Sequence, residues 1–259
     1  MRVLSYLNRQ PWLDRVVALL PLVLLLMVWA AVSAAEWYPR ELLVPPLEVW
    51  AALRELLASG ELQEHLRMSL GRLGFGMLVG CGCGLLFGVL MGLSRTVEVY
   101  TAPLFQVVRQ VPSIALIPIF ILMFGIGETF KILIVTKAAF FPVALAAYTA
   151  VQGISEHWLE VARVYRLPRI ALFRRIVVPA TVPPIVTGVR LALGRSWGTL
   201  VAAELLAAES GIGQMMEFGR QMFRLDVVMM GVVITGLIGF GLDRAIRLLE
   251  RRLVRWRAQ

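Results

Sequence analysis

Charged side chains within long apolar runs are the residues of this sequence best placed to do chemistry. Arg109 lies six residues into such a run, Arg190 lies at a similar depth in a later run, and Glu204 lies near the end of that later run. In a bilayer, an ionised side chain is costly unless it faces protein, water or an opposite charge. Arg109 and Arg190 therefore either neutralise carbonyl groups at helix ends or face an aqueous path, where they would attract an anion. Lys137 is a weaker candidate of the same kind, and Glu204 is expected to pair with a cation.

No group of residues suits catalysis or metal binding. His65 and His157, the only histidines, flank different apolar runs, and Cys81 and Cys83 stand two residues apart in a glycine-rich run. Side chains two apart on a helix point to different faces, so these cysteines favour neither a disulfide nor a metal site. The sequence also lacks the Gly-x-x-x-x-Gly-Lys-Ser/Thr run that binds nucleotide phosphates. We therefore expect a non-enzymatic chain with no catalytic residue, no metal and no cofactor of its own.

A second group of candidates lies in residues 155–180, between two apolar runs. Ser155 is a candidate N-cap for a short amphipathic helix, Pro168 would break that helix or begin a second one, and Pro179 would end the second. Each helix would carry an apolar stripe and a charged face. This pattern is typical of helices that rest on the surface of a lipid bilayer.

The composition indicates that these residues belong to a membrane protein. Hydrophobic residues make up 59% of the 259 residues, charged residues make up 17%, and the mean hydropathy is +0.77. Soluble chains are usually about 45–50% apolar and about 25% charged, so a soluble enzyme, a disordered chain and a disulfide-rich secreted scaffold are poor interpretations. The net charge of +9 comes mostly from arginines between the apolar runs, which favours membrane topology and anionic lipid over nucleic acid as its explanation.

Six apolar runs are long enough, or can be extended enough, to cross a bilayer, which takes about 20 helical residues. They cover about residues 16–35, 73–93, 103–125, 128–150, 183–206 and 227–247. We therefore predict an all-α integral membrane protein in which residues 1–259 form one transmembrane domain with six helices and both termini on one side. The segments on that side hold fifteen arginines and the opposite segments hold six basic residues, so the positive-inside rule predicts cytoplasmic termini.

Glycine recurs at every fourth position of the second run, at Gly76, Gly80, Gly84, Gly88 and Gly92. Small residues at this spacing form one stripe on a helix and let a second helix approach closely. Two partners suit such a stripe, a helix of the same chain and a helix of a second copy.

The spacing within residues 155–180 resembles a known pattern. Glu160-Val161-Ala162 is followed, after thirteen residues, by Ile176-Val177-Val178-Pro179. This resembles the EAA loop of ABC-importer permeases, which reads Glu-Ala-Ala, three residues, Gly, nine residues, and Ile-x-Leu-Pro. Arg166 stands where the pattern has glycine, which departs from the tight turn usual there, and Pro168 is a second candidate for the break.

Further segments are similar to permeases of the nitrate/taurine/aliphatic-sulfonate group, in one order over about residues 40–256. They are Arg109–Pro118, Phe124–Lys131, Gly188–Ala192, Thr199–Glu204, Ser210–Gly213 and Leu248–Trp256. The chain is therefore identified as a member of that group, and the resemblance implies the MetI-like fold of type I ABC importers.

The resemblance also implies the partners and the roles of residues. The partners are a second copy in a homodimer, two cytoplasmic ABC ATPase subunits that bind ATP and Mg, and a periplasmic or extracellular substrate-binding protein. The residues implied for ATPase coupling are Glu160, Ala162, Arg166, Pro168, Arg169 and Pro179, and those implied for the translocation pathway are Arg109, Pro112, Arg190 and Glu204.

The expected function is import of a small anion, such as a sulfonate, taurine or nitrate, through the bacterial inner membrane. An ion-coupled secondary transporter or channel is the alternative, although the apolar runs contain no acidic residue other than Glu204 and, at or near the run ends, Glu128 and Asp243. An integral membrane enzyme is a third interpretation, which the absence of a metal or nucleophile constellation disfavours.

Overall fold

The structure is a computed structural model that describes residues 11–39 and 43–253, and within these ranges it contains helices and connecting turns but no strand. The elements are α1 (Pro11–Ala34), α2 (Pro46–Ser59), α3 (Glu61–Leu93), α4 (Arg95–Val108), the 3-10 turn η1 (Ile114–Leu116), α5 (Ile117–Phe124), α6 (Glu128–Gln152), α7 (Glu156–Val164), α8 (Arg169–Leu172), the π-helical turn η2 (Phe173–Val177), α9 (Val178–Ala207), α10 (Ile212–Gln221) and α11 (Leu225–Leu253). The all-α prediction is confirmed for these residues.

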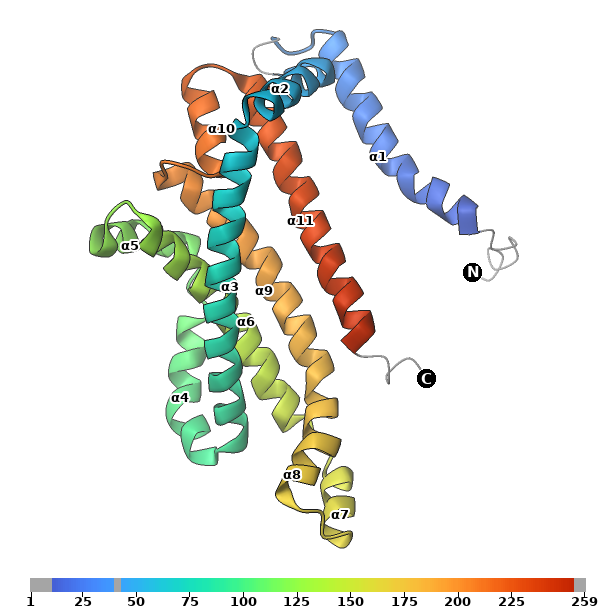
Figure 1. Ribbon diagram of the computed structural model, residues 1–259, viewed down its shortest axis with the longest axis vertical. Helices are drawn as coiled ribbons and strands as arrows, with labels where there is room; N and C mark the ends of the chain where they lie inside the picture. Colours follow the sequence, from blue (N-terminus) through green and yellow to red (C-terminus); the bar gives the residue numbers. More distant parts are fainter. Residues whose placement is uncertain (1–10, 40–42, 254–259) are drawn as a thin grey trace.

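The centre of the bundle is formed by α3, α6 and α9, with α6 between the other two (Figure 1). The glycine stripe of α3 explains how closely α3 approaches α6. A Cβ atom on Gly80 would lie 2.5 Å from the carbonyl oxygen of Thr136, and one on Gly84 would lie 2.6 Å from that of Phe140. The stripe therefore packs within the chain, and the alternative of packing against a second copy is wrong for these glycines.

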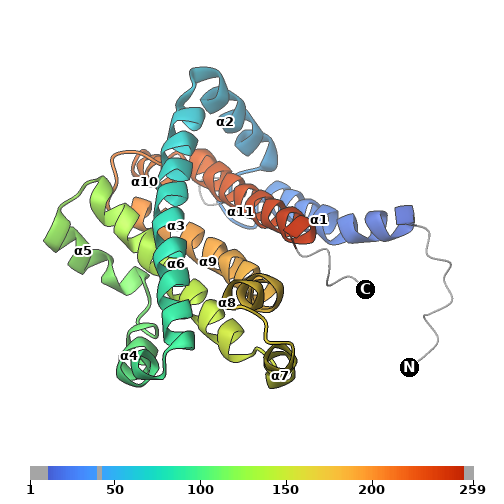
Figure 2. The same ribbon diagram turned by 60° about the horizontal axis from the view of Figure 1, so that its bottom comes forward.

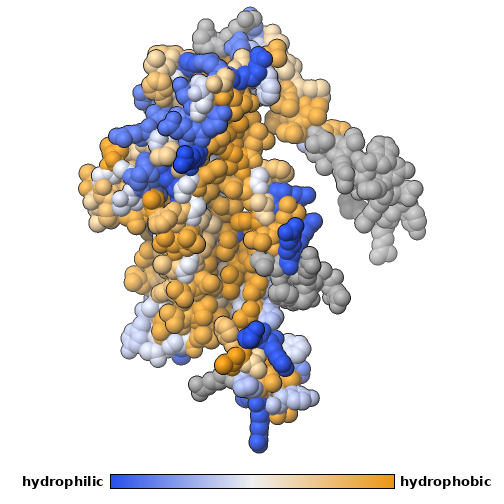
Figure 3. Space-filling model, in the orientation of Figure 1, coloured by the Kyte–Doolittle hydropathy of each residue, from blue (hydrophilic) through white to orange (hydrophobic). Residues whose placement is uncertain are grey.

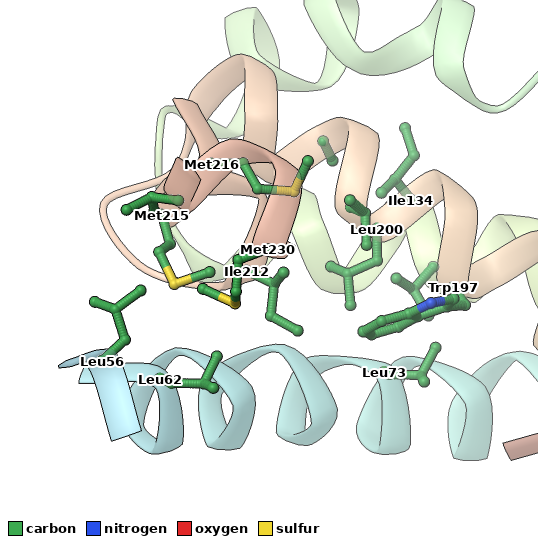
Figure 4. Close-up of a cluster of buried hydrophobic side chains, with 14 of the residues drawn as sticks. Leu56, Leu62, Leu73, Ile134, Trp197, Leu200, Ile212, Met215, Met216 and Met230 are labelled. Carbon is green, nitrogen blue, oxygen red and sulfur yellow. The ribbon is translucent and has the colours of Figure 1, made fainter. Parts of the chain in front are cut away.

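An apolar core joins the other helices to this centre near α2 and α10. Leucines of α2 and α3 face methionines of α10 and α11, and Trp197 of α9 lies opposite Leu73 (Figure 4). The Trp197 indole Nε1 donates a hydrogen bond to the carbonyl oxygen of Thr235 at 3.0 Å, which satisfies its polar group inside the bundle. The labelled members are Leu56, Leu62, Leu73, Ile134, Trp197, Leu200, Ile212, Met215, Met216 and Met230.

Four helices of the described chain are long and apolar enough to cross a membrane: Glu61–Leu93, Glu128–Gln152, Ile170–Ala207 and Leu225–Arg252. Each of them contains one of the predicted spans, namely residues 73–93, 128–150, 183–206 and 227–247. The described apolar part of α1, Leu20–Ala34, and the segment Ile114–Phe124 are shorter. The described residues therefore do not confirm six full-length spans.

The predicted continuous span at residues 103–125 is wrong. The helix ends at Val108, the chain turns, and a separate short helix, α5, begins at Ile117. Pro112 explains the break, because proline has no backbone N–H and disfavours helical geometry in the preceding residue, Val111. Hydropathy did not reveal this break because the residues on both sides of it are mostly apolar, despite Arg109 and Gln110.

The second helix predicted within residues 155–180 does not end at Pro179. Helix α8, the π-helical turn η2 and α9 form one continuous helix from Ile170 to Ala207. Pro179 is tolerated because it occupies the first turn of α9, after the change of helical pitch in η2, where a missing N–H costs little.

The two ends of the bundle differ in composition from its middle (Figure 3). Hydrophilic residues gather around α2 and α10 at one end and around α7 and α8 at the other, with an apolar band between them. The described start of α1 and end of α11 both point away from α2 and α10 (Figure 1). Helix α1 extends away from the bundle in both ribbon views and meets it at α2 (Figures 1 and 2).

Candidate functional site

A cavity of about 420 Å³ lies where the turn after α4 crosses α6 and α9. Three positively charged side chains line it: Arg109 from the end of α4, Lys137 from α6 and Arg195 from α9. Pro112 lines it too, so two of the four predicted pathway residues lie together. No carboxylate belongs to the described lining.

The break at Pro112 explains how this cavity is built. A broken helix leaves carbonyl oxygens without their usual N–H partners. Lys137 compensates for one of them, since its Nζ donates to the carbonyl oxygen of Val111 at 2.6 Å and lies 3.5 Å from the Ser113 Oγ. Within the described chain, the buried Nε of Arg109 has no hydrogen-bond partner.

The cavity continues along α6 and α9 as a groove with a changing character. A space of about 230 Å³ includes Arg109 and Arg195, and a further space of about 410 Å³ also includes Arg195. Pro142 and Arg195 line all three spaces. The further space is lined mainly by apolar and small residues, namely Pro142, Leu145, Ala146, Thr149, Pro184, Thr187, Gly188 and Leu191, besides Arg195. We call the whole the α6–α9 groove.

Arg190 lies outside this groove. Its Nε donates to the Asp243 carboxylate at 2.5 Å, and Arg247 donates to the other oxygen of that carboxylate at 2.8 Å. Arg190 therefore joins α9 to α11.

Glu204 lies in a buried ionic cluster near α10, also outside the groove. The carboxylate, 1% exposed, pairs with Arg72 at 2.7 Å and accepts hydrogen bonds from the Ser69 hydroxyl at 2.9 and 2.8 Å. Arg72 also pairs with Glu128 at 2.6 Å, and Lys131 pairs with Glu128 at 2.9 Å. The expectation that Glu204 pairs with a cation is confirmed, and the cluster connects α3, α6 and α9.

The segment Ser210–Gly213 closes over this cluster because two of its residues are glycines. A side chain on Gly211, which has a φ of +116°, would collide with the Glu204 carboxylate. The Gly213 N–H donates to that carboxylate at 3.2 Å, and Arg72 donates to the Ser210 carbonyl oxygen at 2.6 Å. Sequence reasoning found this motif without finding Arg72, whose only signal is its place directly before an apolar run.

The loop at residues 155–180 projects beyond the bundle (Figure 1). Helix α7 has Ser155 at its N-cap position, and it ends in a Schellman motif in which the Leu167 N–H donates to the Ala162 carbonyl oxygen and the Arg166 N–H to that of Arg163, both at 3.0 Å. Arg166 takes the left-handed residue of that motif, with a φ of +47°. The tight turn usual at the glycine of the EAA pattern is therefore present.

Five of the six predicted coupling residues lie in or next to this turn, and the sixth, Pro179, lies further along the chain in α9. Glu160 is exposed on α7, Ala162 is buried beneath it, Pro168 directly precedes α8, and Arg169 begins α8. Large apolar side chains stay open beside them: Trp158 is 57% exposed, Tyr165 75% and Ile170 75%.

Long apolar helices in a bundle, with a loop of EAA spacing outside it, are the architecture of a transport permease. Residues 84–255 match the family described as the binding-protein-dependent transport system inner membrane component. The chain therefore belongs to this family of ABC-transporter permeases, and its relatives place it in the sulfonate, taurine and nitrate group.

Three relatives illustrate that group. An aliphatic sulfonates transport permease protein, SsuC, of Bacillus subtilis (strain 168) is 38% identical over 92% of this chain and 86% of its own length. The taurine transport system permease protein TauC of Escherichia coli (strain K12) is 34% identical over 92% of this chain and 88% of its own length. The nitrate import permease protein NrtB of Leptolyngbya laminosa is 33% identical over 73% and 68%.

Solved structures support the fold. A chain of an amino acid ABC transporter with histidines matches 78% of this chain and 97% of its own with a TM-score of 0.61 and 15% identity. A chain of an inward-facing MetNI methionine ABC transporter matches 70% of this chain and 92% of its own length, with a TM-score of 0.55 and 21% identity. The MetI-like permease architecture is thus confirmed at the level of the fold.

Proposed function

We propose that this chain is the membrane-spanning subunit of an ATP-driven importer, that residues 155–180 couple it to cytoplasmic ATPases, and that its solute is a small organic or inorganic anion. The observation that carries the proposal is the projecting α7–α8 loop. This loop has the EAA spacing, and one continuous helix, Ile170–Ala207, connects it to the α6–α9 groove. The sequence has no P-loop motif, so we infer that ATP and Mg bind to the partner subunits.

The loop suits protein docking better than lipid contact. Its exposed apolar residues, Trp158, Tyr165 and Ile170, belong to the loop around α7 and α8, which lies beyond the apolar band (Figures 1 and 3). Aromatic side chains with a charged surround are typical of the energetic centre of a protein interface. Glu160 is exposed on the same helix, α7, where it can contact an ATPase groove or orient the helix within it.

The assembly follows from the same family membership. We infer a homodimer with two ATPase subunits and a substrate-binding protein on the α2/α10 side, in a bacterial inner membrane. The loop, the start of α1 and the end of α11 would face the cytoplasm, as the arginine excess predicts. Helix α1 leaves the bundle with most of its described apolar side chains exposed, so lipid or the second copy would cover them.

An anionic solute is favoured by the charges along the groove. Arg109 and Arg195 line it without a carboxylate partner in the described chain, and Lys137 accompanies them. We assign Arg109 and Pro112 to the pathway. Arg190 and Glu204 keep the helices in place instead, because each is held by an ion pair outside the groove.

The coupling role is tested by Glu160→Lys in the complete transporter in proteoliposomes. We expect the variant to lose solute uptake while its ATPase activity no longer responds to the loaded binding protein, since the charge reversal falls at the docking surface. Glu250→Lys, the same exchange at a partly exposed residue near the end of α11, outside the loop and away from α2 and α10, is the control and should keep both activities. Normal, coupled uptake by Glu160→Lys would exclude Glu160 from the interface, and failure of the chain to copurify with any ATPase would overturn the importer assignment.

A further inference from the structure

We propose that the α6–α9 groove is a binding site within the permease for an amphiphilic organic anion: a sulfonate head held by Arg109, Lys137 and Arg195, with a short alkyl chain lying along Leu145 and Leu191. This inference rests on the proposed function and deepens it, because it places solute selectivity partly in this chain and favours an alkanesulfonate over nitrate.

The charged end of the groove has unused binding capacity. Three other arginines that are buried or partly buried, Arg72, Arg190 and Arg224, each pair with a carboxylate of the chain. Arg109 and Arg195 have no such partner in the part of the chain that the structure describes, and the buried Arg109 Nε has no hydrogen bond at all. A buried donor without an acceptor is costly, and an anion would supply the acceptor.

The shape of the donors suits an oxyanion. A guanidinium presents N–H groups in a planar fork that can bind two oxygens of one anion, whereas an ammonium acts as a point charge. Lys137 is already fixed by the Val111 carbonyl oxygen, so it contributes its charge from a set position. Two arginines and one lysine therefore match the three oxygens of a sulfonate.

The length of the groove favours a solute with a tail. The charged space of about 420 Å³ continues past Arg195 into about 410 Å³ lined mainly by apolar and small groups. Nitrate would leave that second space to water. Each methylene buried there should strengthen binding about twofold to fourfold, since full burial of a methylene approaches a factor of four.

The full-length chain in lipid nanodiscs, without any binding protein, is the material for the test. Isothermal titration calorimetry compares unbranched alkanesulfonates from ethanesulfonate to hexanesulfonate with nitrate and with hexylammonium. We expect affinity to rise along the sulfonate series, with nitrate weaker than hexanesulfonate and no binding of hexylammonium.

Variants separate the head from the tail. Arg195→Gln should weaken hexanesulfonate at least tenfold, and Leu191→Ser should weaken hexanesulfonate but not ethanesulfonate. Both side chains are exposed in the groove, so folding should survive, and a thermal melt checks this. Arg95→Gln removes an equal charge from an exposed site near the α3–α4 turn, outside the groove, and should bind as the unaltered chain does.

Several results would overturn the proposal: affinity that does not depend on chain length, nitrate that binds as tightly as hexanesulfonate, or Arg195→Gln that binds normally. Absence of sulfonate binding, in a chain whose complete transporter still imports sulfonates, would also overturn it while the proposed function stands. A complete transporter that imports no anion would instead refute the anionic part of the proposed function.

Discussion

Gly84→Ala tests whether the glycine stripe sets the distance between α3 and α6. The new Cβ would lie 2.6 Å from the Phe140 carbonyl oxygen, and carbon and oxygen normally approach to about 3.3 Å, so the helices must separate by about 0.7 Å. Overpacking of this kind costs about 1–3 kcal/mol. Alanine also gains about 1 kcal/mol over glycine as a helix former, which offsets part of that cost.

Gly82→Ala is the matched control, because a Cβ at Gly82 meets nothing within 4 Å. It keeps the gain in helix propensity without the collision, so the difference between the two variants isolates a steric cost of about 1–3 kcal/mol. Unfolding by SDS in mixed micelles measures it, with fluorescence of the buried Trp197 as a signal. Equal stability of the two variants would refute the close packing, and an effect that changes with protein concentration would point to a second copy. Gly84→Leu should prevent folding or assembly.

Two further substitutions test the ionic cluster and the loop turn. Glu204→Gln should lower the free energy of unfolding by about 3 kcal/mol, the lower part of the range for breaking a buried ion pair, because Glu128 still pairs with Arg72. The same exchange at the exposed Glu209 should leave the free energy of unfolding unchanged in the same assay, and equal effects would contradict the burial argument. Arg166→Gly should raise the melting temperature with coupled uptake retained, since it relieves about 1 kcal/mol of left-handed strain; a lower melting temperature would mean that the Arg166 side chain makes a stabilising contact.

The apolar runs were predictable because bilayer-crossing helices are marked by composition over about 20 residues, which needs no partner information. The break at Pro112 was missed for the opposite reason: one residue changes the backbone path while the composition on both sides stays apolar. The left-handed turn at Arg166 was also hidden, because the sequence has arginine where the family pattern has glycine.

The groove could be predicted only in part. Arg109 was found because it is charged within an apolar run, and Pro112 because it shares a short family motif with Arg109. Arg190 gains its carboxylate partner 53 residues away, at Asp243, and no local pattern encodes such a pairing. Arg195 was overlooked as a site residue, although one signal was available: five residues after Arg190, it must lie on a different face of the helix, so at most one of the two could face a given cavity.

The continuous helix from Ile170 to Ala207 has a mechanical consequence, because its end near α10 lies within the bundle whereas its other end projects with the loop at residues 155–180 (Figure 1). The Glu204 cluster fixes the end near α10, about 14 Å along the axis from Arg195 and about 47 Å from Phe173 at about 1.5 Å per residue. If the helix tilts about that fixed end, each residue moves in proportion to its distance from the end. A displacement of about 6 Å at Phe173 would therefore move Arg195 by only about 2 Å. The π-helical turn and Pro183 lie between them and absorb part of the displacement by bending. In the proposed importer, a large displacement of the loop by the ATPases would thus move the Arg195 guanidinium in the groove by only a small distance.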